Sequence, residues 1–237
     1  MDILSKKLLQ DIPNAAVKFL NAWGDTGLQT TPANFSLCLT LKMTQAEFNG
    51  MTNYGLLIGQ VNNDSLASPN CNYIYKVGAQ FIYLYKSANL SSARAVYFPT
   101  ASMAALLDGN AHKIVVITAN GGTRIYVDGG RIANYTSSLV PTEFTSSAWN
   151  TSFRIGNHAS SMQKGGTISN IKYFNFDISA TGAAYTLDDY QNNRDIPDGI
   201  SGVILNLHNK LSGTTWTDES GNGYNMTLSG DFEITDE

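Results

Sequence analysis

The chain has 237 residues, of which 43% are hydrophobic and 14% are charged, and it contains 21 glycines. This composition excludes a disordered chain and is typical of a turn-rich, all-β protein. The formal net charge is −4, and no basic stripe with interleaved aromatic residues occurs, so nucleic acid is excluded as an expected partner. No run of roughly 18 apolar residues occurs either, so we expect no membrane insertion.

Residues 1–14 are predicted to form a short N-terminal arm. Their apolar residues recur at helical spacing and stop at Pro13; they are Ile3, Leu4, Leu8, Leu9 and Ile12. So short a helix is marginal without tertiary contacts, so it either packs on its own domain or binds a neighbouring subunit. The segment lacks the apolar centre of a signal peptide, and we therefore expect the chain to be made in the cytoplasm of the producing cell.

Residues 15–237 are predicted to form one β domain. Nearly every apolar run in it is short, rich in β-branched or aromatic residues, and bounded by turn residues such as Asn-Gly-Gly. The runs are 35–43, 54–61, 73–77, 81–85, 113–119, 124–129, 153–156, 168–176, 203–207 and 224–230. Strands of this number and spacing favour an all-β, two-sheet antiparallel sandwich or jelly roll. Helical turns are predicted only at 101–107 and 186–193, where Thr186 and Asp189 are spaced to cap the helix start.

The stretch 72–86 places five aromatic rings in two runs on either side of a glycine. Because side chains alternate between the faces of a strand, the length of the turn at Gly78-Ala79 decides which rings share a face. A two-residue turn, which Gly at its first position favours, splits the rings, whereas an odd-length loop puts all five on one face. With the two-residue turn, the face predicted to enter the core carries Tyr73, Tyr75, Ile82 and Leu84.

The opposite face of this hairpin is predicted to be the wetter one and to bind a ligand. It carries Lys76, Phe81, Tyr83 and Tyr85, together with Ile74. Aromatic rings with phenol hydroxyls suit a ligand such as a sugar, because they offer an apolar face and a polar edge. The alternative is that these tyrosines only lie on the sheet with their hydroxyls in solvent.

The loop 61–65 offers Asn62, Asn63 and Asp64, whose oxygens are of the type that calcium prefers. A full calcium site needs roughly six to eight oxygens from several loops. The loop is therefore either part of a calcium site with Asn62 and Asp64 as ligands or an ordinary polar turn.

Cys38 and Cys71 lack the spacing of a metal knot and are either two free thiols or a disulfide. No other cofactor is expected.

A family resemblance is carried by two stretches. Residues 106–136 read LLDGNAHKIVVITANGGTRIYVDGGRIANYT, and residues 153–179 read FRIGNHASSMQKGGTISNIKYFNFDIS. The first resembles the Asp-Gly-x-Trp-His hairpin, with its Tyr-Val-Asp-Gly end, of the laminin-G-like, concanavalin-A-like jelly-roll superfamily, and the second resembles the strand pair that follows it. The resemblance implies a lectin-type jelly roll. Ala111 stands where the family usually has Trp, so another residue is expected to fill the core beneath that strand.

Residues 200–237 are predicted to pack on this domain or to complete it. Within them, 202–230 are similar to segments that follow laminin-G-like modules in bacteriophage tail and other virion proteins, with a Trp-x-Asp-x-Ser-Gly-Asn-Gly core. Asp218 and Asn222 of this core either bond their own backbone in an Asx-type turn or hold a cation. Residues 175–237 carry a net charge of −9, which is either a solvated surface or a cation or docking face.

Catalysis is not expected. A glycosidase on such a fold needs two carboxylates roughly 5–10 Å apart, and the nearest match, residues 233–237, lies where a terminal strand frays. His112, His158 and His208 are far apart in the sequence, and none has an acidic or Cys neighbour at a ligand or triad spacing. His112 is expected to pack as a strand-start residue. Binding is therefore favoured over an enzymatic activity.

These features favour a non-enzymatic virion structural protein, such as part of a phage tail, a fibre or a capsid decoration. The expected partners of its lectin-like domain are other virion subunits and a bacterial surface glycan, and a homo-oligomer is expected. The virion is the expected location, reached from the host cytoplasm without a signal peptide. The alternative is a stand-alone carbohydrate-binding lectin module of a cellular organism.

Overall fold

A computed structural model describes residues 15–60, 70–87, 89–137, 140–145, 152–156 and 165–236. The predicted arm 1–14 and the loop that contains Asn62 and Asp64 lie outside these residues, so both stay predictions. No described helix is long and apolar enough to cross a membrane.

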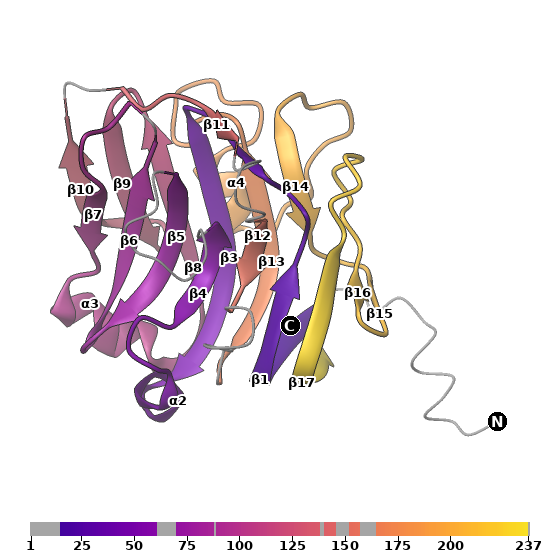
Figure 1. The fold of residues 1–237 in the computed structure, drawn as a ribbon. Coiled ribbons are helices and arrows are strands. Elements are labelled where there is room, and N and C mark those ends of the chain that lie inside the picture. The colour runs from indigo at the N-terminus through magenta and orange to yellow at the C-terminus, as the bar shows by residue number, and fades with distance from the viewer. Residues whose placement is uncertain are drawn as a thin grey trace.

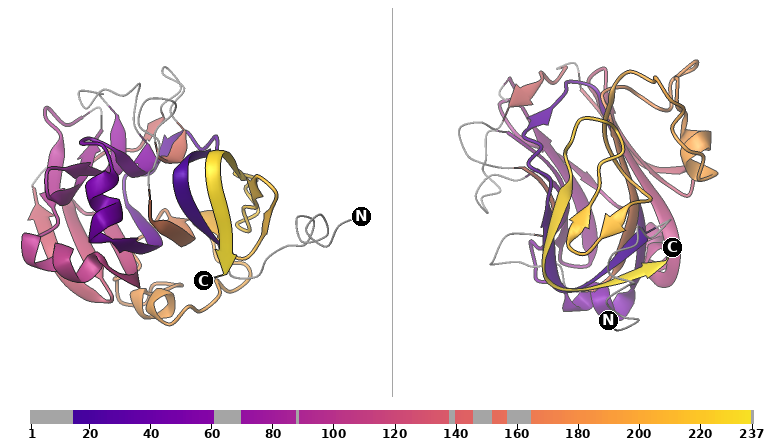
Figure 2. Two further views of the ribbon diagram at one scale, coloured as in Figure 1. Left: turned by 90° about the horizontal axis from the view of Figure 1, so that it is seen from below. Right: turned by 90° about the vertical axis from the view of Figure 1, so that its right-hand side faces the viewer.

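Fifteen antiparallel strands form one continuous network, which folds over into two facing layers (Figures 1 and 2). The first layer contains, in order, β10 (Gly130–Thr136), β9 (Gly122–Val127), β8 (Asp108–Ala119), β3 (Phe35–Thr44), β13 (Thr167–Phe174) and β14 (Val203–Leu207). The second contains β7 (Arg94–Tyr97), β6 (Gln80–Lys86), β5 (Cys71–Val77), β4 (Leu56–Gln60), β12 (Phe153–Ile155) and β17 (Met226–Asp236), with β16 (Thr215–Trp216) and β15 (Leu211–Ser212) at its end. The predicted all-β antiparallel sandwich is thus confirmed.

Strand β1 (Ala15–Asp25) joins the two layers. Its residues Ala16 and Lys18 pair with β13 of the first layer, whereas Gly24 and Asp25 pair with β12 of the second. Along its other edge β1 pairs with β17, with an irregularity between Phe19 and Asn21. A separate two-stranded pair is formed by β2 (Thr30–Thr31) and β11 (Phe144–Thr145).

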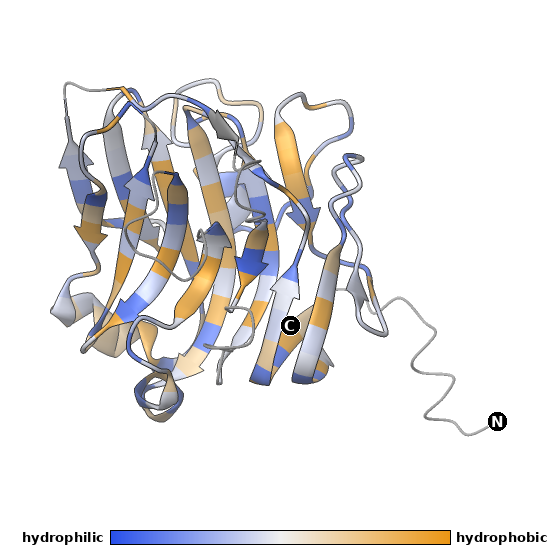
Figure 3. Cartoon of the chain, in the orientation of Figure 1, coloured by the Kyte–Doolittle hydropathy of each residue, from blue (hydrophilic) through white to orange (hydrophobic). Residues whose placement is uncertain are grey.

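Alternation along the strands decides which side chains meet between the layers, and Figure 3 shows it as alternating orange and blue bands. On β3, Leu37, Leu39 and Leu41 enter the main core, where they join residues of the second layer. The intervening residues of β3 point to the outer side of the first layer. The upper part of that outer side is a second buried cluster, in which Cys38 packs with residues of the segment 176–200.

In the described part of the chain, three short helices interrupt the strands. The predicted helical turns are confirmed as α3 (Thr100–Leu106) and α4 (Leu187–Gln191), and the Thr186 and Asp189 side chains form the predicted cap of α4. The helix α2 (Gln45–Gly50) was not predicted, although Thr44 and Glu47 form the same kind of reciprocal capping box and could have been read from the sequence.

The two cysteines are free thiols, and both are buried. Burial raises the pKa of the Cys71 thiol to about 12, and it raises the pKa of Cys38 further. Because the thiolate is the reactive form, neither side chain is suited to redox or nucleophilic chemistry in the folded protein.

The β5–β6 hairpin has the predicted two-residue turn. Val77 pairs with Gln80, and Tyr75 pairs with Ile82. Gly78, the first turn residue, has a φ of 57°, which is the left-handed conformation that a type II′ turn requires and that glycine adopts without a steric penalty. The five rings are therefore split between the two faces, as the parity of the turn predicts.

The prediction of which face is wetter was wrong. Phe81, Tyr83 and Tyr85 are 0% exposed and lie in the main core, and Lys76 is 7% exposed. The Tyr83 hydroxyl, which suggested a wet face, instead meets a partner inside the core, since it lies 3.3 Å from Oγ1 of Thr118. None of these four side chains presents a surface to a ligand in this fold.

Lys76 acts as a cap on the end of helix α2. Its ammonium donates hydrogen bonds to the carbonyl oxygens of Phe48 at 2.9 Å and Met51 at 2.8 Å, and it lies 4.8 Å from the centre of the Phe48 ring. Unpaired carbonyl groups at a helix C-terminus carry partial negative charge, which explains why a buried lysine is tolerated there. The predicted core face of the hairpin is also largely buried, in a smaller cluster with Leu56 and Cys71.

His112, at the start of β8, is clamped between two carboxylates. Its Nδ1 lies 2.7 Å from Asp128 and its Nε2 lies 3.0 Å from Asp108. Partial burial lowers the pKa of the His112 ring, but the hydrogen bonds to Asp128 and Asp108 outweigh this effect and hold the pKa above its ordinary value of 6.5. The carboxylates thus tie the ends of β8 and β9 together through a protonated imidazole.

We expect this clamp to make stability depend on pH near neutrality. Because the folded pKa of His112 is raised, its contribution is fully present below pH 6.5 and is lost as the pH rises through the folded value. The melting temperature should therefore fall by about 2–4 °C more in the native protein than in His112→Gln as the pH is raised from about 6 to about 8.5. Parallel melting profiles of the two proteins would contradict this account.

The Asp218 carboxylate organises the turn before β17. It accepts hydrogen bonds from the backbone N–H groups of Asn206, Ser220 and Tyr224 and from the Ser220 hydroxyl. The bond to Ser220 is the predicted Asx-type turn. Asn222 behaves differently from prediction, since its amide donates to the carbonyl oxygens of Val203 and Ile204 and to the Ser220 hydroxyl instead of bonding its own backbone. The structural alternative explains both side chains, because the Asp218 oxygens are already engaged.

Candidate functional site

A polar groove runs across the lower outer face of the first layer. Two adjoining hollows of about 390 Å³ and 510 Å³ form it, and Thr40 of β3 and Ala111 of β8 line both. The main core lies beneath the same strands, so the groove is built on a rigid floor rather than on loops.

The floor consists of two rows of side chains that the strand register places side by side. In the first row Ala111 of β8, Lys42 of β3, Thr167 of β13 and Lys18 of β1 follow one another. In the second row the order is Lys113, Thr40, Ser169 and Ala16 on the same strands. All eight residues line the hollows, and they comprise three lysines, three hydroxyl residues and two alanines.

The hydroxyl of Thr40 lies in the middle of this floor. Thr40 is 3% exposed, and its Oγ1 is a buried oxygen with no hydrogen-bond partner among the described residues. An unsatisfied buried polar group costs about 1–3 kcal/mol, so native structures retain few of them. Because this oxygen is closed to solvent, a ligand hydroxyl in the hollows would bond to it, and so remove this cost, only after the Thr40 side chain rotates about χ1.

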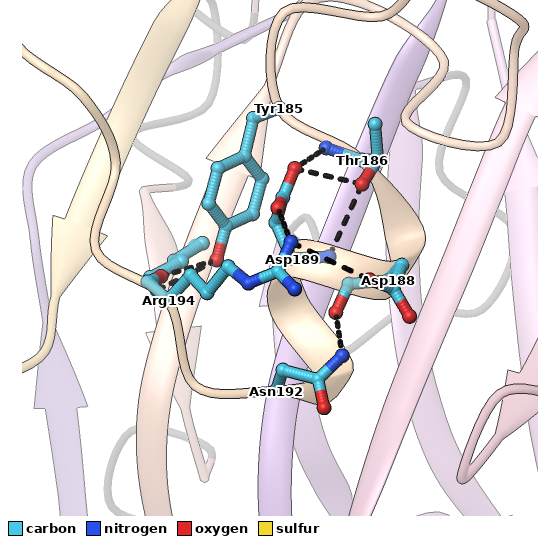
Figure 4. Close-up of polar contacts among 7 residues, drawn as sticks. Tyr185, Thr186, Asp188, Asp189, Asn192 and Arg194 are labelled. Carbon is cyan, nitrogen blue, oxygen red and sulfur yellow. Dashed lines mark hydrogen bonds and ion pairs between the residues drawn. The ribbon is translucent and has the colours of Figure 1, made fainter.

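The segment that follows helix α4 lines the larger hollow with Asn193 and Asp195, and His208 and Asn209 line it from the segment after β14. His208 Nδ1 lies 3.8 Å from Asp195 Oδ1. Figure 4 shows how α4 is held. Asp189 accepts hydrogen bonds from the Thr186 backbone and hydroxyl and from Arg194 at 2.7 Å. The Thr186 hydroxyl and the Arg194 guanidinium hold the pKa of Asp189 below its ordinary value.

A buried lysine of β13 holds the same segment in place through hydrogen bonds. Lys172 of β13 is 0% exposed, and its ammonium donates to the Tyr185 hydroxyl at 3.0 Å and to the Arg194 carbonyl at 3.2 Å. The Tyr185 hydroxyl also donates to the Arg194 carbonyl, at 2.8 Å (Figure 4). These contacts fix the chain that leads from α4 to Asp195, so this segment is preorganised.

The other end of the groove is closed by the start of helix α2. Thr44 and Glu47 line the smaller hollow together with Gly109. Glu47 is committed to the helix cap, because its carboxylate accepts from the Thr44 backbone N–H at 2.8 Å and from the Thr44 hydroxyl at 2.9 Å. Lys18 is likewise engaged, with Glu233 at 3.0 Å.

The arrangement is suited to binding a polar ligand. Its lining offers hydroxyl, amide and ammonium groups, which can donate to and accept from a polyhydroxylated molecule. Among the described residues, no group of His, Cys, Asp or Glu side chains is placed to hold a metal ion. The groove carries its carboxylates at the rim rather than as a facing pair on the floor.

None of the ligand residues predicted from the sequence lies in this groove. Lys76, Phe81, Tyr83 and Tyr85 belong to the second layer and are buried, and Asn62 and Asp64 fall outside the described residues. The groove residues could have been suspected from local alternation only, because Thr40 and Lys42 are polar residues between the inward leucines of β3.

Other residues of β8 fill the core, as was expected from Ala111 in place of the family's usual Trp, and Ala111 itself lies on the other face. Its side chain is exposed and lines the groove on the outer face of the layer, while Ile114 and Val116 of the same strand supply the core. A large residue at position 111 would cover the floor, so alanine opens the groove there instead of leaving a gap in the core.

Solved structures with the same architecture are found at low sequence identity. One, provisionally described as a carbohydrate-binding protein from Bacteroides ovatus, matches with a TM-score of 0.59 and 14% identity over 96% of this chain and 60% of its own. The present chain thus spans about 60% of the length of that protein. The heptameric pentraxin of Limulus polyphemus matches with a TM-score of 0.53 and 12% identity over 96% of this chain and 97% of its own.

The fold is a lectin-like jelly roll. Mouse laminin α1 domains LG4-5 also match, with a TM-score of 0.46 and 14% identity over 68% of this chain and 41% of theirs. Neither a protein-family model nor a curated protein sequence matches the chain. The two matches with TM-scores above 0.5 confirm the predicted jelly-roll fold.

Proposed function

We propose that this jelly roll is a non-catalytic carbohydrate-binding domain and that the groove on β8, β3, β13 and β1 is its binding site. The observation that carries the proposal is the buried, unpartnered hydroxyl of Thr40 on the floor shared by both hollows. A sugar hydroxyl is both a donor and an acceptor and fits such a group. The fold shared with the Bacteroides ovatus protein supports the same class of ligand.

Thr40→Val tests this site, because valine keeps the shape of threonine and removes only the hydroxyl. We expect affinity for the strongest hit of a glycan array to fall about 3- to 10-fold, which corresponds to one neutral hydrogen bond of about 0.7–1.4 kcal/mol. Stability should stay unchanged or rise, because an unsatisfied buried oxygen is removed. Titration calorimetry and thermal melting measure the two effects.

The matched control is Thr136→Val, which removes an exposed hydroxyl on β10, outside the groove. It should leave affinity unchanged. A Thr40→Val protein that binds as tightly as the native protein, or a glycan array without hits, would count against the groove as a saccharide site.

We further propose that the carbohydrate-binding domain serves a virion, as a tail, fibre or capsid-decoration protein that contacts a bacterial surface glycan and assembles as a homo-oligomer with other virion subunits. The support is the similarity of residues 202–230 to segments of virion proteins. Mass spectrometry of purified particles should detect the chain, and light scattering should report an oligomer. Neighbouring genes without capsid, portal or tail functions, together with a monomer, would favour the stand-alone cellular lectin instead.

A further inference from the structure

The eight side chains of the groove floor have an unbalanced charge. Lys18, Lys42 and Lys113 contribute three cations, and the remaining five side chains are hydroxyl residues or alanine. Among the acidic residues, Glu47 and Asp195 line the hollows beside this floor, and Glu233 pairs with Lys18.

The strand register places the three lysines on the same face as Thr40. Lys113 is the cross-strand partner of Thr40, and Lys42 follows Thr40 by two residues on the same face of β3. Lys18 stands in the row of Lys42 but two strands away, which is roughly 10 Å at the usual strand spacing. The cations are thus spread over a ligand-sized area around the unpartnered oxygen.

The three lysines differ in whether their ammonium groups already have a hydrogen-bond or ion-pair partner. The Lys113 ammonium donates to the Gln191 carbonyl, and Lys18 is paired with Glu233. Lys42 is exposed and engages no carboxylate in the ion pairs among the described residues. Lys42 lines the smaller hollow, and its exposed side chain is available to a ligand.

From this geometry we infer that the groove selects an acidic saccharide, whose carboxylate or sulfate is bound by Lys42 while a neighbouring hydroxyl bonds to Thr40. The inference rests on the proposed function of the groove. The whole chain carries a net charge of −4, so general attraction of polyanions does not account for such selectivity. Charge-assisted hydrogen bonds are stronger than neutral ones, which makes the acidic group the larger part of the expected affinity.

The test is an array of sialylated, uronate-containing, sulfated and neutral glycans, followed by calorimetry on matched pairs. The pairs are tetragalacturonate with its methyl ester, sulfated with unsulfated dextran oligosaccharide, and the best acidic array hit with its carboxyl-reduced or desulfated form. We expect an acidic form to bind about tenfold more tightly than its neutral form. Whichever matched pair shows the preference identifies the bound acidic group as a carboxylate or a sulfate.

The preference should disappear in Lys42→Gln and persist in Lys210→Gln, a control at an exposed lysine outside the groove. Equal binding of acidic and neutral forms that is still weakened by Thr40→Val would overturn the acidic ligand and leave the saccharide site standing. A preference that Lys42→Gln does not reduce would also overturn the inference. Absence of binding to every glycan would overturn the proposed function itself.

Discussion

Ala111→Trp is expected to abolish glycan binding while the protein stays folded. Ala111 lines both hollows and lies between His112 and Asn110 on an exposed part of β8, so an indole there would cover the floor around Thr40 and Lys42. We expect affinity to fall by at least about 30-fold, or about 2 kcal/mol. Thermal stability should change little, because Trp suits an exposed strand position.

The control for this variant is Ala101→Trp, which adds the same side chain at an exposed position of α3 that does not line the groove. It should bind like the native protein. If Ala111→Trp bound as tightly as Ala101→Trp, the groove would not be the saccharide site, whatever the array showed. The comparison separates a filled groove from a general effect of an added aromatic residue.

Tyr83→Ala is expected to have the largest effect on stability. The Tyr83 ring is 0% exposed in the main core, and its hydroxyl lies 3.3 Å from Oγ1 of Thr118. Truncation would leave a cavity and remove the contact with the Thr118 hydroxyl, at a cost of about 3–5 kcal/mol in the free energy of unfolding. Urea denaturation measures this loss.

The matched variant is Tyr97→Ala on the neighbouring strand β7, where the ring is 55% exposed. It should change the free energy of unfolding by less than about 1 kcal/mol. A folded Tyr83→Ala protein that lost ligand binding but kept its stability would return this residue to the binding surface on which the sequence had placed it.

Local features of the fold could be predicted because the interactions that decide them lie close together in the sequence. The β5–β6 turn follows from Gly78, whose positive φ fixes a two-residue turn and therefore the pairing of Tyr75 with Ile82. The α4 cap follows from the spacing of Thr186 and Asp189. The same logic applies to Thr44 and Glu47 at α2, and that signal was missed.

The face of the β5–β6 hairpin that enters the core could not be read from the same residues. The charge of Lys76 suggested that its face of the hairpin contacts water. In the structure its hydrogen-bond partners are carbonyl groups of α2, which lies about 25 residues earlier in the chain. The hydroxyl of Tyr83 suggested that its ring is exposed to solvent, but this hydroxyl lies next to Thr118 of the opposite layer. A buried polar group is tolerated wherever a partner is supplied, and only the packing of distant strands supplies these.

The groove shows the same division between local and distant information. Alternation on β3 indicates that Thr40 and Lys42 share a face. Their neighbours Ala111, Ser169 and Lys18 come from strands that are far apart in the chain and meet only through the register of the sheet. The amino-acid sequence by itself determined strands, turns and helix caps, because their energetics are local. The tertiary structure decided which faces are buried and where the binding groove lies, because burial and cross-strand pairing depend on residues that only the fold brings together.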